Sequence, residues 1–566
     1  MPPIDAQREL AALADALIAH RRETGYGVYG GARVDRPNIP FDDLTLECAQ
    51  REAAFHRGML SRLDRIDLRG APAIAQVEAA TLRHVYEFGA KADEDYFLEF
   101  AITPYTGGDR LARAIDRMKS TVLATSDDLA VYLRLLDAYV ALLRQTAGKT
   151  RAQIERGIRV SKPDIEGVRK TFNGLADSAG ELQPPDARLP RLATAELAAF
   201  ARDVERRIGS VRQACADILA LVDADYVDRA PDEVGLWRYP GGRERYHRLI
   251  AYEGYGHTAA EINEVARAQV VALEAEMAQV RRSMGYDGTA AAFHAELRRS
   301  PRLVVHTSAE LEAKYDAFMA KMLPLIPRFF RRVPSITYGY MPLDPALDNG
   351  TRGGGARPPT ATDPVGRYVY PTFDLANKSL EVAAAHRIFH ELAPGHVFQR
   401  ELVREHARPS NLGRMQLRFP GYAEGWAEYA ARLGIEMGAF PEPHDLYLQL
   451  LAEANNASRS VIDTGMNYLG MTLDDARAYL REHSPIMSDI AVKAETLRFG
   501  ADTFGYCLSY RMGFTRITET RRRAEAALGD RFDLRDFHAV VLEDGSMPLD
   551  VLAAHVDNWV EERGAG

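Results

Sequence analysis

Cysteine is scarce in this chain, with 3 among 566 residues. Cys48, Cys215 and Cys507 are odd in number and far apart, so no disulfide framework is implied and a reducing compartment is expected. The chain also lacks an uncharged apolar run long enough to cross a bilayer. Residues 1–5 contain no basic segment followed by an apolar stretch, so we expect no signal peptide. These absences predict a soluble, cytoplasmic protein.

An excess of positive charge is also absent. The formal net charge is -9, and residues of both signs are spread along the chain. Nucleic-acid-binding proteins usually carry a basic surface, so nucleic acid is not expected as a partner. The lack of a bilayer-crossing run likewise predicts no membrane partner. Hydrophobic residues make up 46% of the chain, which is ample for a large buried core.

Helical patterns dominate, and strand-like segments are rare. Thr258 and Glu261 form a capping-box pattern that begins a long helical stretch, which Gly285 ends. The best strand candidate is residues 367–373, which are rich in β-forming side chains. Pro371 cannot donate to a strand ladder, so an edge strand or an extended segment is expected there. The sequence therefore predicts a mainly α fold.

The most informative segment is HELAPGH at residues 390–396, followed by EGWA at residues 424–427. A catalytic zinc site uses three protein ligands and leaves a fourth position open for water. In a His-Glu pair on a helix, the histidine usually binds the metal and the glutamate takes a proton from the water. The two motifs therefore predict one bound zinc ion, or another divalent metal in its place.

The spacing of the two histidines requires a distorted helix. His390 and His396 are six residues apart, so on an ideal helix their directions would differ by about 120°. Pro394 removes a backbone donor and Gly395 permits unusual dihedral angles, so the backbone can deform there. We expect a break that brings His396 back towards His390. Ser379 is expected to cap the helix that carries His390.

A competing pair of histidines remains open. His386 and His390 are four residues apart and fit an undistorted helix. A metal site built on this pair would leave His396 to contact the substrate or to support a ligand. This alternative gives no joint explanation of Glu391 and the Pro-Gly pair that follows it.

Two glutamates compete for the third ligand position. Glu424 follows a Pro-Gly pair and is expected in the first turn of the next helix. Glu428 lies one turn later on the same face, and Arg432 another turn beyond it. Glu424 has the better claim to the metal. Glu428 could orient a ligating histidine or form a surface ion pair with Arg432.

The chain also resembles a known bacterial family. Residues 390–399 are similar to the H-E-x-x-P-G-H-x-x-Q signature of domain of unknown function 885, and residues 424–427 to its E-G-W-A motif. The resemblance covers almost the whole length, and further landmarks lie at residues 97–103, 235–237, 240–241, 510–513, 537–538 and 548–549. That family resembles zinc metallopeptidases. The resemblance implies that His390, His396 and Glu424 bind the metal and that Glu391 is the general base.

The resemblance also implies an architecture. It implies a large helical body in two lobes around a deep metal-containing cleft, with a small β element beside the metal helix. Residues 1–566 are predicted to form one metallopeptidase-like unit. Within it we expect an N-terminal helical lobe at residues 1–185 and the metal site in residues 186–566.

Two further residues are candidates for roles around the metal. Amide hydrolysis needs a group that stabilises the oxyanion as it forms. Tyr510 lies where the family has a tyrosine followed three residues later by glycine, and it is our candidate. Its alternative role is that of a tyrosine packed in the core. His538 is expected to be structural rather than catalytic.

Three functions follow from these features. The first is a cytoplasmic zinc hydrolase that cleaves peptide bonds of short peptides. The second is a metal-dependent enzyme recruited to a non-peptide amide or another small metabolite. The third is a non-catalytic binding protein, and the intact Glu391 argues against it. The sequence gives no indication of the oligomeric state.

Overall fold

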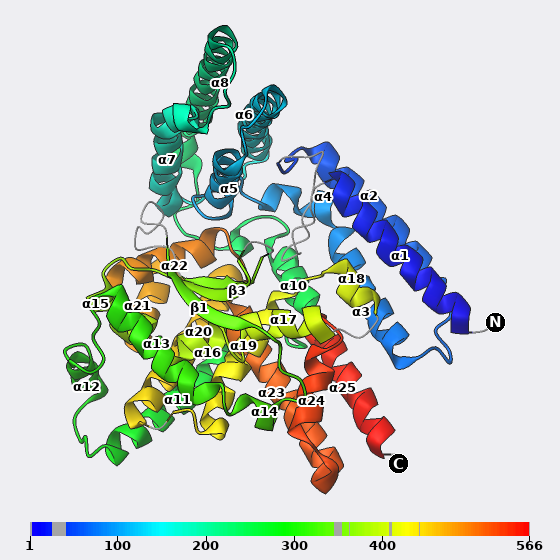
Figure 1. Cartoon of the computed structure of the whole chain (residues 1–566), viewed down its shortest axis with the longest axis vertical. Coiled ribbons are helices and arrows are strands. Elements are labelled where there is room, and N and C mark those ends of the chain that lie inside the picture. The colour runs from blue at the N-terminus through cyan, green and yellow to red at the C-terminus, as the bar shows by residue number, and fades with distance from the viewer. Residues whose placement is uncertain are drawn as a thin grey trace.

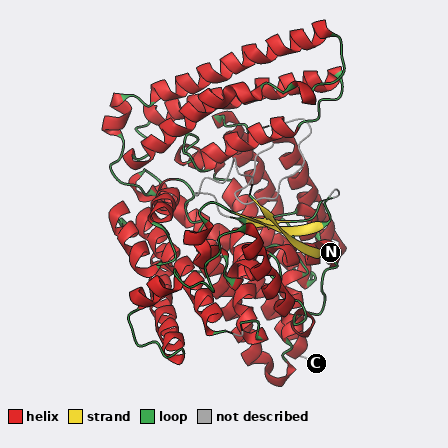
Figure 2. Cartoon of the chain, turned by 60° about the vertical axis from the view of Figure 1, so that its left-hand side comes forward, coloured by secondary structure: helices red, strands yellow, loops and turns green. Residues whose placement is uncertain are grey.

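The structure, a computed structural model, describes residues 3–24, 41–343, 354–360, 363–406, 410–440 and 442–564. Helices make up most of it, as Figures 1 and 2 show, and the predicted mainly α fold is confirmed. None of the helices in these ranges combines the length and apolar character needed to cross a membrane.

The first part of the chain forms helices α1 to α10. The long helices α6 and α8 pack along each other, and α7 packs against α8, at the top of Figure 1. The predicted lobe boundary at residue 185 falls between α7 and α8, and a separate N-terminal lobe stays a prediction. The helices are α1 (Pro3–Thr24), α2 (Leu46–Leu63), α3 (Ala73–Gly89), α4 (Ala92–Asp95), α5 (Thr106–Ser120), α6 (Ser126–Glu155), α7 (Lys162–Asp177), α8 (Thr194–Leu221), α9 (Ala224–Arg229) and α10 (Gly242–Glu253).

Among the remaining helices, α19 has residues that are almost all buried by its neighbours. α16, α17, α20 and α23 pack directly against α19, and α11 lies along α20. The helices are α11 (Ala259–Ser283), α12 (Ala290–Leu297), α13 (Ser308–Met322), α14 (Ile326–Phe329), α15 (Leu375–Val382), α16 (Ala385–Glu391), α17 (His396–His406), α18 (Asn411–Met415), α19 (Pro420–Met437), α20 (Pro443–Thr464), α21 (Leu473–His483), α22 (Asp489–Ala501), α23 (Leu508–Leu528), α24 (Leu534–Leu542) and α25 (Leu549–Gly564).

Helix α11 begins and ends as its sequence predicts. The Thr258 hydroxyl accepts from the Glu261 amide at 3.3 Å, and the Glu261 carboxylate accepts from the Thr258 amide at 2.7 Å. These two bonds satisfy amides that the first helical turn leaves without partners. The helix ends just before Gly285, whose φ of 73° is in the left-handed region that glycine tolerates.

Glycines allow α19 and α23 to approach each other closely. A Cβ added to Gly425 would lie 2.4 Å from the backbone carbon of Gly513, and one added to Gly513 would lie 2.2 Å from the Gly421 oxygen. Any larger residue would push the two helices apart, because packed interiors leave no spare volume. This approach brings the segment around Tyr510 towards Glu424.

A small sheet lies beside α16 and α17, the metal-signature helices, which carry the two histidines of the HELAPGH motif. Its strand order is β1-β3-β2, with β1 parallel and β2 antiparallel to β3. The prediction of an edge strand at residues 367–373 is wrong, because β3 is the middle strand. Pro371 lies just beyond the end of β3, so the ladder loses no donor. The strands are β1 (Thr337–Pro342), β2 (Gly355–Arg357) and β3 (Val365–Tyr370).

The sheet lies directly against α17. A Cβ added to Gly366 of β3 would lie 2.4 Å from Cγ1 of Val397, the second residue of α17. Glycine at this position therefore lets the strand contact the helix that carries His396. A small β element thus lies beside the metal-signature helices, as expected.

Candidate metal centre

The metal-signature segment forms two helices with a break between them. α16 ends and α17 begins on either side of residues 392–395, where the Pro-Gly pair lies. Gly395 fits this break because an added Cβ would lie 1.8 Å from the His390 backbone oxygen. The ring centroids of His390 and His396 are 4.8 Å apart. The predicted return of His396 towards His390 is therefore confirmed.

The predicted start of the His390 helix at Ser379 is wrong. Ser379 lies inside α15, and α16 begins separately at Ala385. The Ser379 hydroxyl donates to the Leu375 oxygen at 2.7 Å and accepts from the Val305 amide at 2.9 Å. A serine side chain can bond to the carbonyl one turn back as well as cap a helix, and sequence alone does not distinguish these uses.

The three predicted ligands converge on one point. His390 Nε2 and His396 Nε2 lie 3.3 Å and 3.1 Å from the same Glu424 oxygen, Oε2. All three side chains are buried. Zinc ligands at 2.0–2.1 Å in a tetrahedron lie about 3.3–3.4 Å from one another, close to the spacing found here. Two imidazole nitrogens at this spacing from one carboxylate oxygen, with all three ligand atoms within 4.8 Å of one another, therefore fit a single zinc ion.

The electrostatics of this cluster favour a cation. Burial opposes a charge on His390, but its hydrogen bonds to Glu424 and Glu428 outweigh burial and raise the pKa of His390 to about 10. Burial also opposes ionisation of Glu424, yet His396 and His390 hold the pKa of its carboxyl well below the usual range. Two buried carboxylates around one imidazole need compensating positive charge, which a divalent metal would supply.

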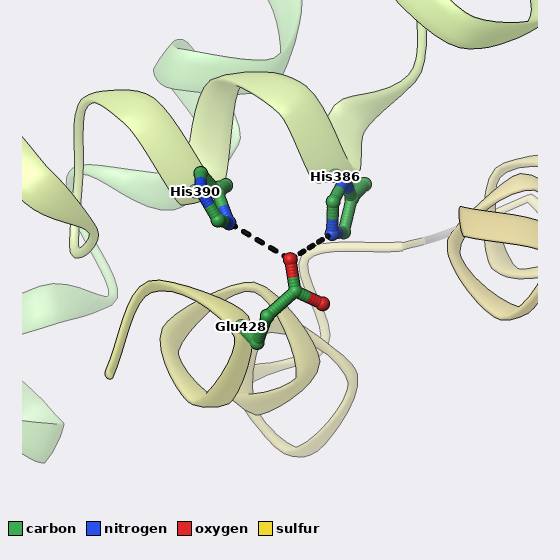
Figure 3. Close-up of side chains that lie close together, drawn as sticks. All are labelled: His386, His390 and Glu428. Atoms are coloured by element: carbon green, nitrogen blue, oxygen red, sulfur yellow. Dashed lines mark hydrogen bonds and ion pairs between the residues drawn. The ribbon is translucent and has the colours of Figure 1, made fainter. Parts of the chain in front are cut away.

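A second cluster adjoins the first and shares His390. Figure 3 shows Glu428 between His386 and His390, with its Oε1 at 3.1 Å from His386 Nε2 and 2.9 Å from His390 Nδ1. These three side chains are also close enough to hold a metal, so the competing histidine pair is assembled as well. A carboxylate on the far nitrogen of a ligating histidine typically orients its ring. Glu428 is placed to do this for His390.

The contacts also bear on two alternatives raised by the sequence. The alternative of a surface pair between Glu428 and Arg432 is wrong, because Glu428 is 1% exposed and Arg432 pairs instead with Glu276 and Glu453. His538 receives core partners on both ring nitrogens, the Phe329 oxygen at 2.8 Å and the Tyr429 hydroxyl at 2.9 Å. Burial lowers the pKa of His538 to about 3, which keeps it neutral, as expected of a structural histidine.

Glu391 is buried and ends α16, directly after the candidate ligand His390. Arg387 lies one turn earlier, with Nη1 at 3.8 Å from Glu391 Oε1 and Nη2 at 3.3 Å from Glu381 Oε1. Its positive charge attracts the Glu391 carboxylate and restricts its position. Sequence reasoning missed Arg387, although the four-residue spacing to Glu391 was a usable signal.

Two tyrosines adjoin the candidate ligands. The Tyr510 ring stacks on His390 with centroids 6.0 Å apart, and Tyr506 donates its hydroxyl proton to Glu424 Oε1 at 3.2 Å. The charge of Glu424 and then burial raise the pKa of Tyr506, and burial and then Glu424 raise that of Tyr510. Both phenols therefore stay protonated and able to donate. Tyr506 was not predicted, although it lies only four residues before Tyr510.

Two solved structures share this fold over nearly their whole length. A candidate lipoprotein from Colwellia psychrerythraea is 22% identical with a TM-score of 0.83, over 98% of this chain and 99% of its own. A candidate lipoprotein of unknown function from Shewanella oneidensis is 16% identical with a TM-score of 0.71, over 96% and 99%. No curated protein matches the chain significantly. At these identities the likeness shows the fold alone.

The predicted cytoplasmic location is contradicted by these relatives. Both are described as lipoproteins, a class that a covalently attached lipid holds at a membrane surface. The prediction rested on missing features, namely a disulfide framework, a leader and a membrane-spanning run. Such absences do not determine a compartment, because an anchored or exported domain can lack disulfides and have an ordinary helical core.

The family resemblance extends across both clusters. The family described as "Bacterial protein of unknown function (DUF885)" matches residues 23–556, a range that includes the two motifs and the tyrosines beside them. The chain therefore belongs to the DUF885 family of bacterial proteins.

Proposed function

We propose that this protein is a zinc-dependent hydrolase that cleaves peptide bonds of short peptides. The observation that carries the proposal is the convergence of His390, His396 and Glu424, with Glu391 beside them. Zinc held by these three ligands would polarise a carbonyl and lower the pKa of a water molecule to about 7. The resemblance of the family to zinc metallopeptidases supports the same reading.

The surrounding residues have complementary roles in such a reaction. Glu391 takes a proton from the attacking water and passes it to the leaving amine. Arg387 holds the Glu391 carboxylate in place through its contact at 3.8 Å. Tyr510 is a neutral donor, so it can stabilise the oxyanion as negative charge develops. Glu428 keeps the His390 ring oriented.

The proposed architecture is a helical body in two lobes around a deep cleft that contains the metal. Such a cleft would admit an extended short peptide and exclude a folded protein. The helices that carry the ligands, α16, α17 and α19, pack against one another, so the catalytic groups are supported by rigid elements.

The test is a digest of a short-peptide library by the zinc-loaded protein, with Glu391→Gln and Glu381→Gln compared. Glu391→Gln keeps the side-chain size but removes the base, so turnover should fall by about 10²–10⁴-fold with zinc content unchanged. Glu381 contacts the same arginine and is the matched control, which should keep most of the activity.

Two results would contradict the proposal. A Glu391→Gln variant with most of its activity would remove Glu391 from the mechanism. An untouched peptide library would rule out peptide cleavage, and amine release from non-peptide amides would then favour the recruited small-molecule function.

A further inference from the structure

A positively charged side chain, Arg418, lies beside one oxygen of Glu424. Arg418 Nη2 lies 3.7 Å from Glu424 Oε1, the oxygen that also accepts from the Tyr506 hydroxyl. The other oxygen, Oε2, lies next to His390 and His396. Arg418 is 42% exposed, so its guanidinium can meet a molecule that arrives from solvent. The candidate metal centre therefore has a cationic side at Oε1.

A second arginine lies near the first. Arg400 is on α17, one helical turn after His396, and so shares the helix face that presents His396 to the centre. The charges of Arg418, Glu424 and Glu391 all act on its half-buried guanidinium. No ion pair or side-chain hydrogen bond joins Arg400 to any residue in the part of the chain that the structure describes. Arginines are rarely buried without a partner, because desolvating a charge is costly.

The nearby carboxylates are already engaged by other groups. Arg387 attracts Glu391, and His386 and His390 bind Glu428. Glu424 contacts both candidate histidine ligands. Its link to the two arginines is the 3.7 Å contact with Arg418. A bound divalent metal would add further positive charge at Glu424. The two arginines therefore provide a site for an anion that comes with the substrate.

We propose that Arg400 and Arg418 bind the free C-terminal carboxylate of the peptide, so that the enzyme cleaves bonds close to that terminus. This inference rests on the proposed peptide hydrolase function. A guanidinium presents two parallel donors that match the two oxygens of a carboxylate. One residue spans only about 3.5 Å, so a terminus held beside Glu424 places the last peptide bonds at the candidate centre.

The experiment compares two tripeptides that differ only at the C-terminus, one a free acid and the other an amide. With the zinc-loaded protein, kcat/KM for the acid should exceed that for the amide by about 10–100-fold, mainly through KM, as expected for charge-assisted hydrogen bonds. Arg400→Gln and Arg418→Gln should each reduce the preference for the acid, by slowing cleavage of the acid far more than cleavage of the amide.

Arg404→Gln is the matched control. Arg404 lies one turn beyond Arg400 on the same helix, is 63% exposed and contacts Glu401 at 2.6 Å, so the variant should keep the preference for the acid. Equal cleavage of acid and amide by the unmodified protein would overturn the inference and leave the hydrolase intact. Cleavage of neither peptide would overturn the proposed function and this inference with it.

Discussion

His390 connects two carboxylates of α19, with Nδ1 at 2.9 Å from Glu428 Oε1 and Nε2 at 3.3 Å from Glu424 Oε2. The two glutamates are one helical turn apart, so a single imidazole reaches both. His386 contacts the same Glu428 oxygen. The two ring nitrogens of His390 therefore have different roles. Nε2 faces the candidate metal position, and Nδ1 faces Glu428, which orients the ring.

Glu428→Gln should weaken zinc binding by about 10–100-fold, because an amide is a poorer acceptor for the far ring nitrogen of His390. Competition with a zinc chelator measures the effect. Glu436→Gln is the control, because Glu436 lies on the same helix but pairs with Arg521 and is 49% exposed. Equal zinc affinity in the two variants would contradict the orienting role of Glu428.

Tyr510→Phe should lower kcat by about 10²–10³-fold and change KM little, because the lost hydrogen bond strengthens only in the transition state. Tyr506→Phe removes a donor to Glu424 and should mainly weaken zinc binding. Kinetics and thermal unfolding on the same preparations separate these effects. A lower Tm with unchanged turnover per folded molecule would identify Tyr510 as a core tyrosine.

Gly395→Ala should destabilise the fold by about 3 kcal/mol, because the new Cβ would lie 1.8 Å from the His390 oxygen and force the break between α16 and α17 to move. Denaturant unfolding measures the change. Gly148→Ala is the control, because no atom lies within 4 Å of the position that the new Cβ would take. This variant should be more stable by about 1 kcal/mol, because alanine is more favourable than glycine inside a helix. Equal stability of Gly395→Ala and the unmodified protein would show that the break tolerates a side chain.

Glu253 should make stability depend on pH. Burial raises the pKa of Glu253 from 4.5 to about 8, against the opposing hydrogen bond from Gly421 and the charge of Arg418. The folded state therefore binds this proton more tightly than the unfolded chain, and its stabilising effect, present below pH 4.5, is lost as pH rises towards 8. Glu253→Gln should leave stability unchanged near pH 4.5 and raise it by up to about 5 kcal/mol above pH 8. Urea unfolding across this range would contradict the account if both proteins showed the same pH dependence.

Local signals in the sequence predicted much of the fold and of the candidate site. The capping box at Thr258 and the glycine at 285 define α11, because both act within a few residues. The Pro-Gly pair predicted the break that brings His396 to His390 for the same reason. The position of β3 was missed, because its neighbours β1 and β2 follow from pairing between separate segments.

Contacts between distant segments could not be predicted from the sequence either. Tyr506 reaches Glu424 from 82 residues away, and Glu428 lies 42 residues from His386. Nothing in the local pattern shows which nitrogen of His390 meets which glutamate, since helix packing decides it. The glycine after Tyr510 was visible, but its role in the close approach of α23 to α19 required the packed structure.

The most direct test of the account is elemental analysis of zinc in the unmodified protein, His396→Ala and His386→Ala. His396 is a proposed ligand, whereas His386 contacts Glu428, the glutamate proposed to orient His390. We predict about one zinc per chain in the unmodified protein and in His386→Ala, and none in His396→Ala. Zinc retained by His396→Ala and lost from His386→Ala would contradict the account, because it would place the metal at the cluster of His386, His390 and Glu428.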